Sequence, residues 1–204
     1  MRCTVINAGI FKPAPPQVVG LDNAAFSTGL SFSFTCSGSN RLLLVYVTSS
    51  GAASSVTYNG VGMTFDSQTG GGFNTEIWKL VAPSSGSNTI SVTLGSGTIR
   101  GVGVMSFTGV HQTTPLGTSA TTSGSGTSGT VSPSGLVSGD LYSASYLWTD
   151  NTATLTPSAA TQAYQAVSSS GSQKIIGIYG TGSLTVTSDV STGFSGIGIT
   201  IKHA

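Results

Sequence analysis

The chain is patterned almost throughout as short β-strands. At residues 30–35 and again at 90–94, apolar side chains alternate with Ser, Thr and other small residues, the period of two that is typical of a half-buried strand. Residues 42–47 are apolar at nearly every position, which predicts a central strand covered on both faces. Asn59-Gly60 predicts a type I′ hairpin turn, because that turn needs a positive φ at both central positions. No window shows helical periodicity.

A similar layout returns in the second part of the chain. Residues 139–142 echo the step from polar to apolar residues at 40–43, and Gly-Ile-Gly-Ile at 196–199 matches Gly-Val-Gly-Val at 101–104. Strands rich in Val, Ile, Ser and Thr also resemble one another by chance. We nevertheless expect one β-unit used twice.

This repeat predicts half-repeats at about residues 30–116 and 130–202. Between them, residues 117–129 contain only Ser, Thr, Gly and a single Ala, which is typical of a flexible connector or a long edge loop. The predicted fold is all-β, a jelly-roll-like antiparallel β-sandwich of about 10–12 strands with two similar halves. We expect residues 26–204 to form a single domain.

The N-terminal residues 1–25 read as an extended, Pro-rich arm. Pro13, Pro15 and Pro16 remove three backbone donors within four positions and favour extended conformation. The arm either lies across its own sandwich or reaches a neighbouring subunit. Its candidate contact residues are Phe11 and these three prolines.

Charge is scarce and balanced. Charged residues make up 6% of the 204 residues, with 7 Lys+Arg against 6 Asp+Glu, whereas an ordinary soluble domain has roughly 25%. No basic stripe could neutralise a run of phosphates, which argues against nucleic acid as a partner, and the same neutrality argues against an anionic membrane. A hydroxyl-rich surface suits hydrogen-bonded contact with sugars or with another protein.

No arrangement of residues matches a known catalytic or metal-binding motif. Asp66 and Glu76 could approach each other across the loop at residues 70–72, but solvated carboxylates are the commoner outcome. His111 and His203 have no Cys, Asp or His at metal-ligand spacing, and no serine lies in a nucleophile elbow. We therefore predict a protein that is not an enzyme and has no cofactor.

Oxygen atoms of loop residues could instead bind calcium, but the signal is weak. Calcium ligands could come from four residues, although they form no dense acidic loop, and we predict no metal site. These residues are Asp140, Asp150, Asn151 and Asp189.

Aromatic rings are the usual platforms for sugars. The candidates are Trp78, Tyr142, Tyr146, Trp148 and Tyr164. Most are expected to fill the core. Trp148 ends a strand pattern just before Asp150 and Asn151, so we expect it to be the exposed ring, with those two polar residues beside it.

Four stretches, at residues 40–45, 56–60, 76–83 and 107–115, carry a resemblance to known proteins. Over about residues 40–116 the sequence resembles a loose group of β-sandwich domains in bacteriophage structural proteins and bacterial surface proteins. The resemblance implies a fold and no catalytic residues. Within phages such domains are similar to capsid decoration (cement) proteins and to tail or fibre modules.

The function expected from this resemblance is that of a virion structural protein, most simply a capsid decoration protein. Its partners would be the major capsid protein or other virion proteins, and further copies of itself. The alternative is a carbohydrate-binding module of a phage tail or bacterial surface protein, with glycans as partners. The first residues contain no apolar signal segment, so we expect synthesis in a host cytoplasm and release in a virion, the alternative being an extracellular or cell-surface location. Cys3 and Cys36 are expected to be free thiols rather than a disulfide.

Overall fold

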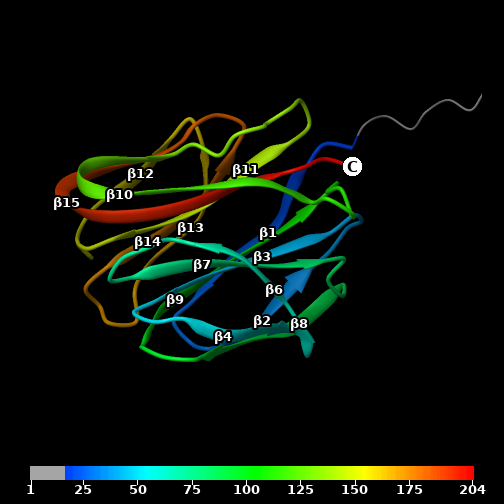
Figure 1. Ribbon diagram of the computed structural model, residues 1–204, viewed down its shortest axis with the longest axis horizontal. Coiled ribbons are helices and arrows are strands. Elements are labelled where there is room, and N and C mark those ends of the chain that lie inside the picture. Colours follow the sequence, from blue (N-terminus) through cyan, green and yellow to red (C-terminus); the bar gives the residue numbers. More distant parts are fainter. Residues whose placement is uncertain (1–16) are drawn as a thin grey trace, which may run out of the picture.

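The computed structural model describes residues 17–204 and shows an all-β protein (Figure 1). These residues contain no helix, and hence none that could cross a membrane. Every strand pairing is antiparallel, and the strands form three sheets. The predicted fold class, an antiparallel β-sandwich, is confirmed.

The first half of the molecule is a two-layered sandwich. One layer is the five-stranded sheet β1-β9-β3-β7-β6, and the other is the four-stranded sheet β2-β8-β4-β5. Its strands are β1 (Gly20–Ser27), β2 (Ser31–Cys36), β3 (Leu42–Ser49), β4 (Ala53–Tyr58), β5 (Val61–Gly62), β6 (Thr64–Gln68), β7 (Asn74–Val81), β8 (Gly86–Leu94) and β9 (Ile99–Thr108).

The second half has the order β10-β15-β11-β14-β13, with β12 also paired to β15. Its strands are β10 (Leu116–Val131), β11 (Leu141–Trp148), β12 (Leu155–Ser158), β13 (Thr161–Val167), β14 (Lys174–Gly180) and β15 (Leu184–Ile201). β10 and β15 are 16 and 18 residues long, and each runs through both layers. Figure 1 shows the halves stacked, with β2, β4 and β8 at one extreme and β10, β12 and β15 at the other.

The two halves share one strand order. β10 pairs with both ends of β15, as β1 pairs with β9 and β2 with β8 in the first half. β11 lies between β15 and β14, as β3 lies between β9 and β7. Each half is itself two-layered, and the predicted jelly-roll connectivity is not confirmed.

Three hydrophobic cores follow from this stacking. The inner core of the first half contains Val45 and Trp78, and that of the second half contains Tyr146 and Trp148. A shared core lies between the halves, where Tyr46 and Met105 of the first half pack near Ile199 of the second. β3 therefore faces a core on each side, and all of its 8 residues are buried, as the apolar run predicts.

The hairpin turn predicted at residues 59–60 is also confirmed. Asn59 and Gly60 join β4 to β5 with φ values of 52° and 74°. Both are positive, as a type I′ turn requires, and only glycine and asparagine adopt such values at low cost.

Two sequence-based boundaries are wrong. Residues 117–129 are not a flexible connector but most of strand β10, whose backbone pairs with β15 along its length. Ser, Thr and Gly give no apolar alternation there because most of the strand is exposed, so the pairing rests on the backbone. The arm predicted for residues 1–25 also extends too far, since β1 begins at Gly20 and pairs with β9.

The two Gly-x-Gly motifs, on β9 and near the end of β15, are out of step by one residue. In the first half Val102 pairs with Val47, which faces the inner core. In the second half Gly196 pairs with Tyr146, which faces the inner core of that half. A one-residue slip moves every side chain to the other face. The glycines of β9 therefore face the shared core, and those of β15 face the inner core.

Candidate functional site

The residues predicted to contact a ligand or partner do not form one site. Phe11, Pro13, Pro15 and Pro16 lie outside the described residues. Asp150 and Asn151 lie on the loop after β11. Asp150 Oδ1 accepts hydrogen bonds from the backbone and hydroxyl of Thr152, both at 2.7 Å, and Asn151 Nδ2 donates to Gly171 O in the loop between β13 and β14. Both are positioned as loop residues.

Trp148 is buried, which corrects the expectation of an exposed ring. Its side chain is 0% exposed and belongs to the inner core of the second half. Trp148 pairs with Phe194 on β15, and the Phe194 ring lies 4.8 Å from the indole, centroid to centroid. Being last in its strand does not expose Trp148, because its strand position faces inward and a neighbouring strand covers it.

The proposed acidic groupings are not brought together. Asp66 pairs with Lys79 at 2.7 Å, whereas Glu76 accepts hydrogen bonds from Ala53 N and Trp78 Nε1 at 2.9 and 2.8 Å. Among residues 17–204, no group of three or more His, Cys, Asp or Glu side chains could hold a metal ion.

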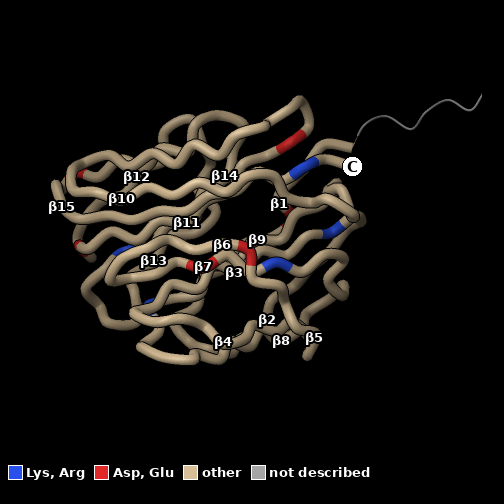
Figure 2. Tube along the Cα trace, in the orientation of Figure 1, with Lys and Arg blue, Asp and Glu red and all other residues tan. Residues whose placement is uncertain are grey.

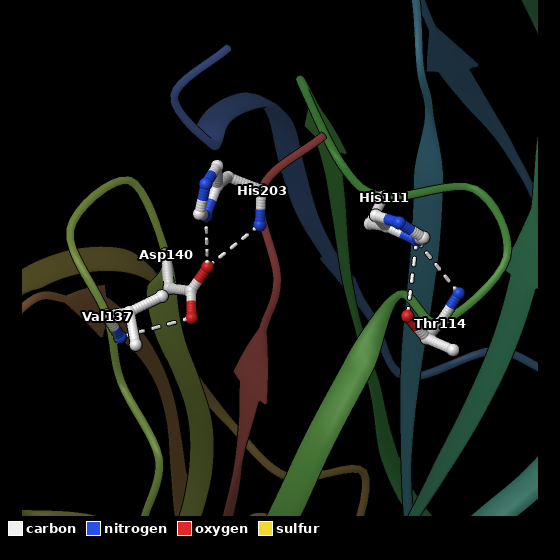
Figure 3. A network of polar contacts seen from close by, with 5 residues as sticks. All are labelled: His111, Thr114, Val137, Asp140 and His203. Atoms are coloured by element: carbon white, nitrogen blue, oxygen red, sulfur yellow. Dashed lines mark hydrogen bonds and ion pairs between the residues drawn. The ribbon is translucent and has the colours of Figure 1, made fainter. Parts of the chain in front are cut away.

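One polar network does join residues far apart in sequence, at the end of the molecule that carries the C-terminus (Figure 3). Asp140 lies just before β11, and His203 lies just after β15. Asp140 Oδ1 accepts hydrogen bonds from the backbone N and ring Nδ1 of His203 at 2.9 and 2.7 Å, and Oδ2 accepts one from Val137 N at 3.2 Å. The network ties the segment before β11 to the residues that follow β15.

Asp140 is held as a carboxylate. Its residue is only 3% exposed, and burial alone would raise the pKa of the carboxyl. The hydrogen bonds from His203 and Val137 outweigh burial and lower the pKa of Asp140 below its ordinary value. The negative charge therefore persists through the neutral range, and because a carboxylate oxygen only accepts, His203 Nδ1 is the donor of their hydrogen bond.

A second histidine lies beside this pair. His111 Nδ1 accepts hydrogen bonds from the backbone N of Thr114 at 3.0 Å and of Thr113 at 3.3 Å. Because a backbone N–H can only donate, Nδ1 of His111 carries no proton in this arrangement. His111 and His203 thus present their rings differently, as Figure 3 shows, with His203 turned to Asp140 and His111 turned to Thr114.

Together these residues border a pocket of about 270 Å³. Its lining residues are His111, Gly135, Val137, Asp140, Lys202 and His203. A carboxylate behind an imidazole is the arrangement that orients a general base. The described lining includes no hydroxyl or thiol side chain.

The start of the described chain crosses the same end of the molecule. Val19 N donates to Gly139 O at 2.9 Å, so the strand leading into β1 is tied to the residue before Asp140. Val18 passes directly over Gly109, where an added Cβ would lie 2.4 Å from Val18 O. A second pocket, of about 340 Å³, lies beside this crossing and is bordered in part by Gln17 and Val18.

Two apolar side chains stand out from this end. Val18 is 68% exposed and Val137 is 58% exposed, and each borders one of the two pockets. We call this surface, formed by Gln17, Val18, His111, Val137, Lys202 and His203, the terminal face.

The sequence contains a usable signal for part of this site. β11 and β15 pair antiparallel, with Leu141 opposite Ile201, so the residue before one strand must lie near the residues after the other. Asp140 and His203 occupy those positions. The sequence does not specify that β11 and β15 pair. Once that pairing is known, it predicts that Asp140 and His203 lie close together.

Comparison of the chain with protein-family models, with curated proteins and with solved structures finds no match. The function is therefore argued from the fold and the terminal face.

Proposed function

We propose that the protein is a non-enzymatic structural component of a virion, most simply a decoration protein that binds the capsid surface through its terminal face. The observation that carries the proposal is the convergence, on that face, of the chain leading to the Pro-rich N-terminal residues with the exposed Val18 and Val137. In this proposal the N-terminal residues reach one neighbour while the terminal face, with its two exposed valines, rests on another.

The acidic side chains support a structural role. All six accept hydrogen bonds or ion pairs from other residues of the fold. They are Asp22 with Ser37, Asp66 with Lys79, Glu76 with Trp78, Asp140 with His203, Asp150 with Thr152 and Asp189 with Thr154. Because these carboxylates already bind groups that hold loops and strands in place, they favour a structural role over that of catalytic acids in a hydrolase.

The distribution of charge supports a protein partner in contact through hydrogen bonds and apolar side chains. Figure 2 shows few charged positions, scattered over the trace rather than gathered on one face. Such a surface gives little long-range steering, so binding would rest on shape and on local contacts. A symmetric, repetitive lattice suits that mode, because many weak sites act together.

The test is whether the protein is part of a particle. Particles released from cells that carry the gene are banded on a density gradient, and an antibody raised against the recombinant protein is used to probe each fraction. The protein is expected in the fractions that contain capsids, at a constant ratio to the main shell protein. Its presence only in the soluble fractions at the top of the gradient would overturn the proposal.

A truncation locates the contact. A variant lacking residues 1–16 keeps β1 whole, since that strand begins at Gly20. It is expected to retain the β-sheet circular dichroism of the full chain but to cosediment more weakly with capsids stripped of the protein. Val137→Asp tests the terminal face in the same assay, and Val167→Asp, at an exposed valine on β13, is the matched control.

A further inference from the structure

A third pocket lies at the opposite end of β11 from the terminal face, where the interface between the halves opens. It has a volume of about 260 Å³ and is bordered on one side by the loop that carries Gly70–72 and Phe73, and on the other by the end of β11 and the middle parts of β10 and β15. Figure 1 places this loop between β6 and β7. The pocket is distinct from the proposed capsid contact and is independent of it.

The lining of this pocket is neutral and rich in hydrogen-bonding groups. Ser123, Thr149 and Ser195 contribute hydroxyls, and the glycines at residues 70–72 leave their backbone uncovered by side chains. None of the described lining residues carries a charge. A charged ligand would find no counter-charge here, whereas a ligand with several hydroxyls would find several partners.

The hydroxyl of Ser195 is buried without a hydrogen-bond partner among the described residues. The residue is only 9% exposed. Ser195 pairs with Ser123 on one side and with Leu147 on the other, so these three side chains share the row that faces the pocket. A buried hydroxyl without a partner is costly, and a group that enters the pocket and bonds to it removes that cost.

One aromatic ring borders the pocket and is held in place from behind. The Phe73 ring lies under the Arg100 guanidinium, whose carbon is 5.1 Å from the ring centroid. Phe194 borders the pocket next to Ser195, but its ring lies on the other face of β15, where it packs on Trp148 in the inner core of the second half. A fixed ring requires no ordering on binding, which favours affinity in a small pocket.

We propose that this pocket binds a neutral saccharide, one pyranose ring lying between Phe73 and Leu147 with its hydroxyls on Ser195, Ser123 and the glycine backbone. Apolar side chains would contact the C–H face of the ring, and the polar groups would fix its orientation, the combination that small-molecule sites use. Trp148 lies on the other face of β11, in the inner core of the second half, and forms no exposed platform.

The test uses the full chain and a panel of neutral sugars: glucose, galactose, mannose and N-acetylglucosamine, with their common disaccharides. Binding is measured by calorimetry and by the shifts of backbone amide NMR signals. At least one sugar is expected to bind with a dissociation constant of about 1 mM or tighter, with shifts at Gly70, Gly71, Gly72 and Gly193. If no sugar in the panel binds, or if the shifts lie elsewhere, the proposal is wrong.

Two variants separate a ligand site from an empty gap. Ser195→Ala removes the unpartnered hydroxyl, so it is expected to leave the fold as stable as before or more so, yet to weaken sugar binding about three- to tenfold. Ser123→Phe is expected to fill the pocket and abolish binding. Thr118→Phe, at another exposed position of β10, is the matched control and should bind as the unmodified chain does. Unchanged affinity in both pocket variants would overturn the assignment.

The ligand class has its own check. Glucuronic acid and glucose 6-phosphate are expected to bind no better than glucose, because no cation borders the pocket. Tighter binding of either charged sugar would contradict a neutral ligand. Since this assay contains no capsid, its failure leaves the proposed virion role untouched, and failure of capsid binding leaves the pocket untouched.

Discussion

The two halves of the molecule reach the same strand order with different strands and different side chains. Where the first half uses β8 and then β9, the second runs β15 through both layers without a break. Val102 faces the inner core of the first half, whereas Gly196 stands at the matching position of the second, under the ring of Tyr146. Strand order therefore depends on which positions face inward and on the sum of their volumes, and far less on which residue supplies the volume.

In the shared core the glycines of β9 have a different role, because large side chains pack directly on them. Glycines of β9 face the shared core, and aromatic rings fill the space they leave. An added Cβ at Gly103 would lie 1.9 Å from the hydroxyl oxygen of Tyr164, in the second half. One at Gly101 would lie 2.2 Å from the ring of Phe26, in the first half, and 3.0 Å from Ile175 Cδ1, in the second. The two halves are thus not interchangeable copies, because a ring of the second half occupies a hollow of the first.

The largest expected effect comes from filling one of these hollows. Gly103→Ala places a methyl group where the Tyr164 ring lies, and that ring cannot retreat because it also rests on Gly177, where a Cβ would lie 2.3 Å away. We expect a loss of about 3 kcal/mol in the free energy of unfolding, or more, measured by chemical denaturation.

Gly62→Ala is the matched control for this substitution. Gly62 lies in the short strand β5, and an added Cβ there meets no atom within 4 Å. Its stability should change by about 0.5 kcal/mol at most. Equal losses in the two variants would show that the halves are not held together by this ring in its hollow.

The next largest effect tests the buried carboxylate of Glu76, whose counterpart in the second half is apolar. Glu76 pairs with Val47, and its counterpart in the second half, Ile176, pairs with Tyr146. Glu76→Ile supplies the counterpart's side chain but leaves Ala53 N–H and Trp78 Nε1–H without their acceptor. A loss of about 2 to 3 kcal/mol is expected in the same denaturation assay.

Its control is Ile176→Val in the second half, which removes one methylene group without exposing a polar atom and should cost about 1 kcal/mol. If Glu76→Ile proved as stable as the unmodified chain, the buried carboxylate would not be an anchor of the first half, and the difference between the inner cores would carry no energetic weight.

Much of this fold is written locally in the sequence. The alternation at residues 30–35, the apolar run that becomes β3 and the Asn59-Gly60 turn all depend on neighbours along the chain, and all three occur as predicted. Residues 117–129 carry no such local signal, because their pairing uses backbone groups that every residue possesses. A strand of this kind can be recognised only once its partner is known.

The candidate site depends even more on distant partners. Trp148 was predicted to be exposed from its place at a strand end, but Phe194 covers it from another strand. Asp140 and His203 meet because β11 and β15 pair, which sequence patterns did not specify. Register decides such contacts, and a slip of one residue, as between the Gly-x-Gly motifs, exchanges core for surface.

A smaller effect is a pH dependence of stability that arises in the second half. Only the second half closes on a carboxylate–imidazole pair, and hydrogen bonds to Asp140 lower its pKa from an ordinary value of 3.8. The stabilisation by the ionised group is complete above that value and is lost as the pH falls through the lower pKa of the folded state. Asp140→Asn should therefore cost about 1 to 2 kcal/mol near pH 7, and the difference from the unmodified chain should shrink as the pH falls below about 4.

Thermal unfolding followed between neutral and acidic pH measures this difference directly. A gap between Asp140→Asn and the unmodified chain that stayed constant across the whole range would mean that the carboxyl contributes through its shape and not through its charge.

The smallest effect concerns a single bond across the shared core. Tyr46 of the first half donates its hydroxyl to Ser143 Oγ of the second at 2.8 Å, and both residues are fully buried. Tyr46→Phe and Ser143→Ala should each cost about 1 kcal/mol, and the double variant should cost less than their sum, because each single change already breaks the bond. Tyr142→Phe is the control, since its hydroxyl bonds to no described side chain. Strict additivity would mean that this bond does not contribute to holding the two halves together.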